Sequence, residues 1–188
     1  MEIKGEYRDI LRRNNAAIID TGWRSNTIAD DFGRFLAALM KKDINPAARA
    51  GIDYIAVGSG GNKPAEFKKR VVALFNRPGG VSGEPLEISE KGWIWAKPID
   101  ASRLEYLDSS DRESPSITNR IKVDIEFEEN EPTQSAWDFE EFGLIGVDKG
   151  PDGRPDPDKL FLINYVSHGK ISKVQSMTLT RTIVLKFL

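Results

Sequence analysis

The last twelve residues of the chain, 177–188, constrain its fold most strongly. Apolar and polar residues alternate through them almost to the final residue. Side chains alternate between the two faces of a β-strand, so this spacing predicts a strand with one buried face. That face would consist of Met177, Leu179, Ile183, Leu185 and Phe187. Chain ends fray unless something holds them, so we expect this strand to be paired in a sheet or with a neighbouring subunit.

Length, charge and cysteine content narrow the class of protein. The 188 residues suit a single domain, residues 1–188, with 39% hydrophobic and 30% charged residues. A net charge of −2 provides no field that would hold nucleic acid or an anionic membrane. The absence of cysteine excludes disulfides, thiolate metal sites and cysteine nucleophiles. With no export signal and no apolar run of the roughly 20 residues that cross a bilayer, we expect a soluble chain made in the cytoplasm, without membrane insertion.

The N-terminal part, about residues 1–48, carries helical patterns. A short helix is expected over 6–13, with Tyr7, Ile10 and Leu11 on one side. The stronger pattern spans 27–42, where apolar residues recur at helical spacing and form a stripe that would pack on a sheet. The stripe consists of Ile28, Phe32, Phe35, Leu36, Leu39 and Met40.

The remainder, about residues 50–188, has the period of β-strands. The cleanest strand covers 121–128, where Ile121, Val123, Ile125 and Phe127 would face the core. Further strands are expected near 53–57, 93–97, 139–147 and 160–166, with turn residues between them. The predicted fold class is therefore α+β: an antiparallel β-sandwich or jelly-roll-like core with an N-terminal amphipathic helix packed on it.

Three patterns invite a chemical interpretation, and each has a simpler structural one. The glycine-rich segment 58–63 follows a strand but lacks the spacing of a phosphate-binding loop, so a flexible turn is favoured. His168 is the only histidine and is expected in a hairpin turn; a hydrolase would depend on it alone. The acidic loop 148–158 lacks the spacing of an EF-hand, so calcium binding there is a minority hypothesis. We expect no bound metal and no cofactor in the protein.

Aromatic residues supply the candidate binding surfaces. Trp93 and Trp95 stand two residues apart, so they would share a strand face and could form a platform for a sugar ring. Trp137 and Phe187 are further candidates for an interface or ligand platform. Packing in a core or interface is the favoured interpretation, because aromatic side chains dominate both.

The order of several segments resembles a group of bacteriophage tail and baseplate-associated proteins, found also among phage-like contractile injection systems. The matching segments read NNAAIIDTG at 14–22, GIDYIAVGSGG at 51–61, EEFGLI at 140–145, LFLINY at 160–165 and LTRTIVLKF at 179–187. The resemblance covers most of the chain and implies no catalytic residues. It implies a structural protein of a virion or phage-like particle, assembled in the host cytoplasm.

The expected function is therefore non-enzymatic: a component of a phage tail, baseplate or neck, or of a contractile injection particle. Its partners would be other particle proteins, and ring symmetry makes a homo-oligomer or multi-copy assembly expected. Fibre attachment and decoration of the particle remain open as positions. The alternative is a carbohydrate- or ligand-binding β-sandwich module, and a hydrolase of unknown type is the third hypothesis.

Overall fold

The computed structural model describes residues 2–41, 51–60, 63–78, 80–88, 92–133, 135–149 and 155–187. The chain divides into two compact units, each built from segments far apart in the sequence. Unit 1 comprises Met1–Ile28, Asp100–Trp137 and Ser172–Leu188. Unit 2 comprises Ala29–Ile99 and Asp138–Ile171. The chain therefore passes from unit 1 to unit 2 and back twice.

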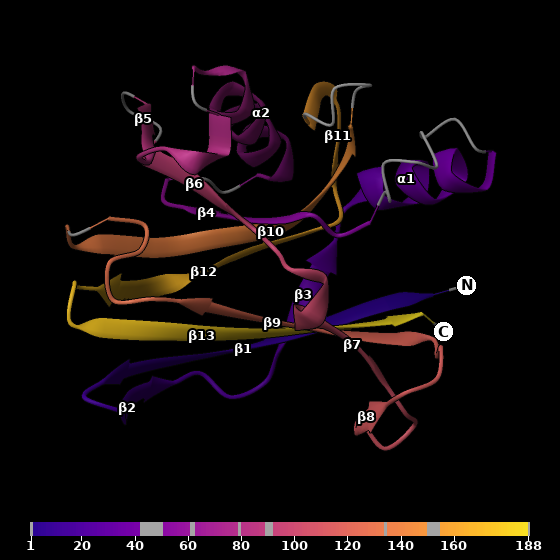
Figure 1. Ribbon diagram of the computed structural model, residues 1–188, viewed down its shortest axis with the longest axis horizontal. Coiled ribbons are helices and arrows are strands. Elements are labelled where there is room, and N and C mark those ends of the chain that lie inside the picture. The colour runs from indigo at the N-terminus through magenta and orange to yellow at the C-terminus, as the bar shows by residue number, and fades with distance from the viewer. Residues whose placement is uncertain are drawn as a thin grey trace. The chain divides into compact units, whose positions relative to one another are not determined.

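Unit 1 is built on antiparallel strands, and the first and last strands of the chain, β1 and β13, pair within its sheet (Figure 1). Strand β13 pairs with β1 over eleven residues on one side and with β9 on the other. Strands β2 and β3 pair with β1, while β7 pairs with β9 and β8. The elements are β1 (Ile3–Arg13), β2 (Ala16–Asp20), β3 (Arg24–Ile28), η3 (Ala101–Arg103), β7 (Leu104–Leu107), β8 (Glu113–Ser114), β9 (Arg120–Phe127) and β13 (Met177–Phe187).

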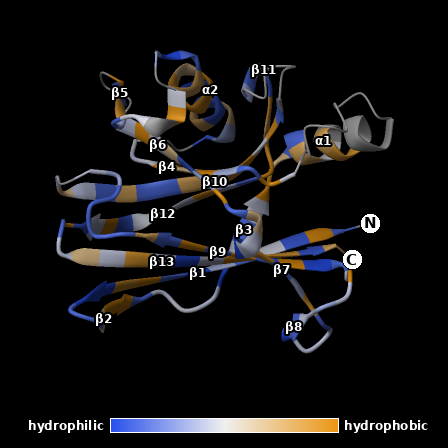
Figure 2. Cartoon of the chain, viewed as in Figure 1, coloured by the Kyte–Doolittle hydropathy of each residue, from blue (hydrophilic) through white to orange (hydrophobic). Residues whose placement is uncertain are grey.

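Alternating residues give this sheet one buried face. On β13, Leu179, Ile183 and Leu185 are fully buried, as the terminal pattern predicted, and Phe187 is half-buried. Val123 and Phe127 of β9 lie on the same buried side, opposite Ile183 and Leu179 in the ladder. Figure 2 shows the alternation of hydropathy along these strands. The predicted strand at the end of the chain is therefore confirmed, and pairing with β1 holds it in place.

Unit 2 combines antiparallel strands with two α-helices. The ladder runs β5, β6, β4 and β10, and β11 pairs with β10. Its elements are α1 (Asp30–Lys41), β4 (Tyr54–Gly58), α2 (Pro64–Asn76), η2 (Gly80–Ser82), β5 (Leu86–Ile88), β6 (Gly92–Pro98), β10 (Trp137–Lys149), β11 (Pro155–Leu162) and β12 (Asn164–Lys173). Trp137 at the start of β10 and the last residues of β12 belong to unit 1.

The core of unit 2 forms between α2 and the strands. Helix α2 begins with a proline, which fits the first turn because its missing N–H is not needed there. Phe67, Val71 and Leu74 recur at three- and four-residue spacing on α2 and are fully buried. They pack in one cluster with residues from β4, β6, β10, β11 and β12, namely Ala56, Ile94, Ala96, Ile145, Val147, Leu160, Leu162 and Tyr165.

Helix α1 contacts β11 within the same unit. Phe32 and Phe35 are buried, and the ring of Phe35 lies 5.1 Å from that of Phe161. The Asp31 carboxylate forms an ion pair with Lys68 of α2 and accepts a hydrogen bond from the Leu162 backbone N–H. Of the predicted stripe, Phe32 and Phe35 are buried and Leu36 is half-buried, whereas Ile28 is half-buried at the end of β3 and does not belong to the helix. The side chains of Leu39 and Met40 lie outside the described residues.

The predominance of antiparallel strands is confirmed, but the predicted helical N-terminus is wrong. Residues 6–13, expected as a short helix, belong to β1, because long pairing with β13 outweighs the local helical spacing. Three strands precede α1, so the first 28 residues are not a helical part. His168, expected in a turn, lies within β12. The loop expected over 148–158 is shorter, because Lys149 pairs with Pro155; residues 150–154 lie outside the described residues.

Candidate functional site

A buried ion pair crosses the centre of the unit 1 sheet. Arg181 of β13 and Asp9 of β1 are cross-strand partners. Arg181 donates from Nε to Asp9 Oδ1 at 2.6 Å and from Nη2 to Oδ2 at 2.7 Å, and both side chains are fully buried. Such a two-point pairing satisfies a carboxylate in the geometry that guanidinium prefers. The pair therefore fixes the register of the two terminal strands.

Tyr7 lies two residues from Asp9 on the same face of β1 and is 3% exposed. Burial raises the pKa of the Tyr7 hydroxyl, and the nearby Asp9 carboxylate raises it further. The hydroxyl is thus held in its neutral, protonated form beside the ion pair. This arrangement stabilises the sheet interior rather than exposing a reactive group.

A second buried cluster links helix α2 to β10 and β12 in unit 2. Arg70 of α2 donates from Nη2 to Glu141 Oε1 at 2.5 Å, and the Tyr165 hydroxyl donates to Glu141 Oε2 at 3.1 Å. Glu141 is fully buried and Arg70 is 4% exposed. Burial raises the pKa of Tyr165 well above its usual range, and the Glu141 carboxylate adds to that rise. Both oxygens of Glu141 are therefore engaged inside the unit.

Arg70 also fixes the beginning of the glycine-rich turn after β4. Its Nη1 donates to the carbonyl oxygen of Ser59 at 2.7 Å and of Trp93 at 3.4 Å. At Gly58, a Cβ atom would lie only 2.3 Å from the Trp93 carbonyl oxygen, so a side chain does not fit there. The glycine is thus needed for close strand packing. Gly61 and Asn62 of the segment lie outside the described residues.

A lysine holds the turn that follows β9 in unit 1. Lys173 is 2% exposed, and its ammonium donates to the carbonyl oxygens of Glu128, Glu129 and Glu131 at 2.5, 3.2 and 2.8 Å. Three converging carbonyl groups satisfy the three donors of an ammonium group. The acidic run 128–131 is therefore anchored to Lys173 through its backbone carbonyl groups.

The aromatic candidates fall into different surroundings. Trp93 and Trp95 are 6% and 8% exposed, because both faces of β6 are covered in unit 2. The Trp93 ring packs edge-on against Phe139, and Trp95 Nε1 donates to the Gly83 carbonyl at 3.1 Å. Stacking on a sugar requires an open ring face, which this packing does not provide. In unit 1, Trp137 is half-buried and donates from Nε1 to Thr133 Oγ1, and Phe187 is half-buried at the end of β13.

The other chemical candidates lie in structural contacts. His168 sits beside the Phe142 ring, with ring centroids 5.9 Å apart. Asp148 is buried, and its Oδ2 accepts from Lys159 at 3.1 Å. Across the described residues, three or more His, Asp or Glu side chains are nowhere grouped to hold a metal ion. Within the same part of the chain, each helix is too short or too polar to cross a membrane.

Among the described residues, several exposed apolar side chains of unit 1 lie on β2 or shortly after it. Every residue of β2 is exposed, and Ile18, Ile19 and Trp23 have exposed fractions of 49%, 37% and 52%. Its apolar residues form a hydrophobic band on the strand labelled β2 in Figure 2. We call Ala16, Ala17, Ile18, Ile19 and Trp23 the hairpin surface. Large apolar side chains gathered in this way on an exposed strand are typical of a protein–protein contact.

The sequence patterns did not reveal the buried ion pairs. Arg181 lies on the same buried face of β13 as Leu179 and Ile183. The one sign of the pair in the sequence is this charged residue among alternating apolar residues. Asp9 occupies the equivalent position between Tyr7 and Leu11 on β1. An oppositely charged residue on each of two buried faces would have predicted the pair.

Comparisons of the chain with protein-family models, curated protein sequences and solved structures found no match.

Proposed function

We propose that this protein is a non-enzymatic structural component of a phage tail, baseplate or neck, or of a phage-like contractile injection particle. It acts by assembling with other particle proteins, as one of several copies. The exposed apolar hairpin surface is the observation that carries the proposal, since such surfaces are usually covered in an assembly. The proposal includes a β-sandwich or jelly-roll arrangement, because apolar sheet faces need a second layer to cover them.

The segments that resemble tail proteins supply further support. Their charged residues include Glu141 and Arg181, and each lies in a buried ion pair. The segment 14–22 contains the turn of the β1–β2 hairpin and its exposed strand β2. The segments that resemble tail proteins thus contribute buried contacts that stabilise the fold and one exposed surface. A protein that assembles with others needs both.

Incorporation into particles tests the proposal. A tagged full-length chain is expressed in its host, and particles are isolated by sedimentation and probed for the tag. We expect the wild-type chain to sediment with particles and to show a native mass above that of one chain. A double variant, Ile18→Asp with Trp23→Ala, should fold but lose most of its incorporation.

Ile117→Asp is the matched control, because Ile117 is 84% exposed in unit 1 but lies outside the hairpin surface. This variant should be incorporated like the wild type. A wild-type chain that remains a monomer and never joins a particle would overturn the proposed function. Equal incorporation of the double variant and the control would show that the hairpin surface is not the contact.

A further inference from the structure

The hairpin surface borders an unpaired strand edge. Among the described strands, β2 pairs with β1 alone, so its outer edge presents main-chain N–H and C=O groups to solvent. Open edges of this kind accept a further strand from another chain. Ile18 and Ile19 of β2 are exposed, and so is Trp23, three residues after the end of the strand. A partner in extended conformation would thus gain both main-chain hydrogen bonds and apolar contacts.

Positive charge predominates around this edge. Four arginines lie within residues 8–24, at positions 8, 12, 13 and 24. The two acidic residues in this range are already engaged: Asp9 is buried against Arg181, and Asp20 binds Arg8 through two hydrogen bonds. Arg13 and Arg24 are exposed. The hairpin is therefore locally basic although the whole chain has a net charge of −2.

We propose that the outer edge of β2 binds an extended, acidic segment of a partner protein as an added antiparallel or parallel strand. Acidic side chains of that segment would meet Arg13 and Arg24, and its apolar side chains would cover Ile18 and Trp23. This inference rests on the proposed assembly function and specifies the chemistry of the partner. Main-chain pairing at the edge supplies affinity, and the arginines select for negative charge.

The same charges argue against two other occupants. Pairing of β2 with β2 of a second copy would bring two arginine-rich hairpins side by side, and like charges across a strand pair are destabilising. An anionic membrane or nucleic acid would use the arginines but leave the strand edge unpaired.

A peptide-binding experiment tests the inference on the full-length chain. The probe is a fluorescein-labelled synthetic ten-residue peptide of alternating glutamate and valine, and fluorescence anisotropy measures its binding. Two control peptides are used: one with lysine in place of glutamate, and one with alternate backbone amides N-methylated. We expect at least tenfold weaker binding for each control peptide. Binding of the acidic peptide should also weaken when salt rises from about 50 to 500 mM, because exposed charges are screened.

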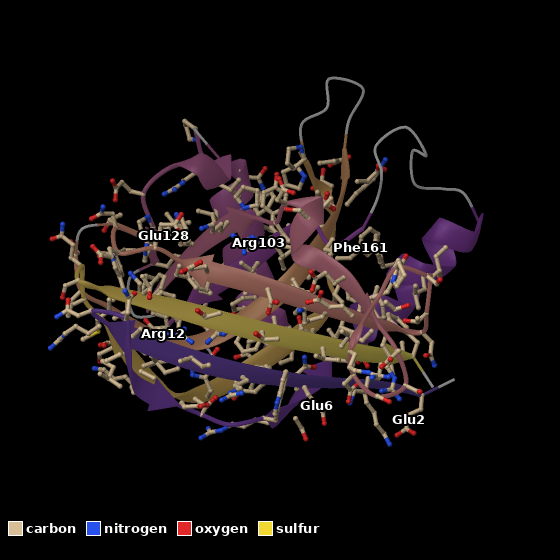
Figure 3. All side chains as sticks on the ribbon, turned by 60° about the horizontal axis from the view of Figure 1, so that its bottom comes forward. Glu2, Glu6, Arg12, Arg103, Glu128 and Phe161 are labelled. Carbon is tan, nitrogen blue, oxygen red and sulfur yellow. The ribbon has the colours of Figure 1, made fainter. Side chains whose placement is uncertain are left out.

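A charge reversal at the hairpin is compared with one elsewhere in unit 1. Arg13→Glu should weaken binding of the acidic peptide at least fivefold. Arg103→Glu is the control, since Arg103 is exposed on η3 and lies apart from the hairpin residue Arg12 in Figure 3. It should leave the affinity unchanged.

Four results would overturn the inference. They are absence of binding up to 1 mM peptide, equal binding of the acidic and lysine peptides, equal binding of the N-methylated peptide, or equal effects of the two arginine variants. If the chain binds vesicles in which half of the lipid is phosphatidylglycerol, but does not bind the peptide, the hairpin binds a membrane surface instead. If the wild-type chain sediments as a dimer and Arg13→Glu changes the fraction of dimer, a second copy of the chain is the occupant of the edge.

Failure here is distinguishable from failure of the proposed function. If the chain joins particles but does not bind the acidic peptide, the assembly function stands and the partner chemistry is wrong. If it binds the peptide but never joins particles, the strand-addition site stands and the proposed function is wrong.

Discussion

Arg181 and Asp9 lie opposite each other at the centre of the β1–β13 ladder and form a fully buried ion pair with two hydrogen bonds. The neighbouring pairs on the same face, Tyr7 with Ile183 and Leu11 with Leu179, are apolar and buried. Removing two charges from water is costly, so the pair is stable only while both partners are present. It therefore disfavours any register that separates them.

Arg181→Met should lower the free energy of unfolding by about 3–5 kcal/mol, because the Asp9 carboxylate would remain buried without its partner. The double variant Asp9→Leu with Arg181→Met should be less destabilised than Arg181→Met, since neither charge remains. Chemical denaturation followed by circular dichroism measures these differences. A double variant that is as unstable as the sum of the single variants would contradict the pairing.

Arg8→Met provides the matched control on the same strand. Arg8 also makes a two-point contact with a carboxylate, Asp20, but both side chains are substantially exposed. Exposed ion pairs are screened by solvent and contribute little, so this variant should be far less destabilised than Arg181→Met. The difference between the two arginine variants thus isolates the effect of burial.

Tyr165→Phe should lower the free energy of unfolding by about 1–3 kcal/mol at neutral pH, because Glu141 loses a buried hydrogen-bond donor. The difference should shrink as the pH rises above about 10. Unfolded tyrosine ionises near that pH, whereas burial raises the pKa of Tyr165 in the folded protein, so alkaline pH favours the unfolded wild-type chain. Urea unfolding at pH 7 and at pH 10.5 measures both effects.

Tyr106→Phe is the corresponding control, because Tyr106 is 36% exposed. Its effect on the free energy of unfolding should stay within about 0.5 kcal/mol, as for other surface substitutions. If Tyr165→Phe and Tyr106→Phe have equal effects at pH 7, the hydroxyl contact with Glu141 does not stabilise unit 2.

The Arg8 hydrogen bonds, with a further one from the Gly22 backbone N–H, lower the pKa of Asp20 from 3.8 to about 2. Because the folded-state pKa lies below the unfolded one, the stabilisation is present above about pH 4 and is lost as the pH falls through 2. Arg8→Met should raise the pKa of Asp20 toward 3.8, as seen in an NMR titration of the side-chain carboxyl carbon. The pKa of Asp100, lowered by hydrogen bonds at Ser102, should not change in that variant. An unchanged pKa of Asp20 would exclude the Arg8 contact as its cause.

The strands that alternate regularly were predictable from the sequence, and β1 was not. On β9 the apolar residues recur every second position, and on β13 they do so except at Arg181, so local spacing identified the buried faces of both strands. On β1, Tyr7, Ile10 and Leu11 have helical spacing, and Asp9 interrupts the apolar alternation on the buried face. The residue that permits Asp9 to be buried is 172 positions away. Local patterns do not contain that information.

The aromatic candidates illustrate a second limit of local patterns. Spacing places Trp93 and Trp95 on one face of β6, but it does not say whether that face is open. In unit 2 the strand is covered on both sides, which buries both rings. Conversely, residues 16–19 form a short apolar run, and the structure places them on the exposed strand β2. Burial depends on what packs against a strand, which the tertiary fold decides.

The turn between β1 and β2 gives the last prediction. Asn14 and Asn15 connect the paired residues Arg13 and Ala16, with φ angles of 49° and 63°. Two positive φ angles in a two-residue hairpin define a type I′ turn, for which Asn followed by Gly is the preferred sequence. Asn15→Gly should therefore leave the free energy of unfolding unchanged or raise it by up to about 1 kcal/mol. Replacing both residues by alanine should lower it by about 1–2 kcal/mol per residue, because a Cβ atom without a polar side chain disfavours this conformation.

Thermal and urea unfolding of the two variants measure the difference. If they are equally stable, the turn does not hold the conformation that presents β2, and the hairpin surface loses its structural basis.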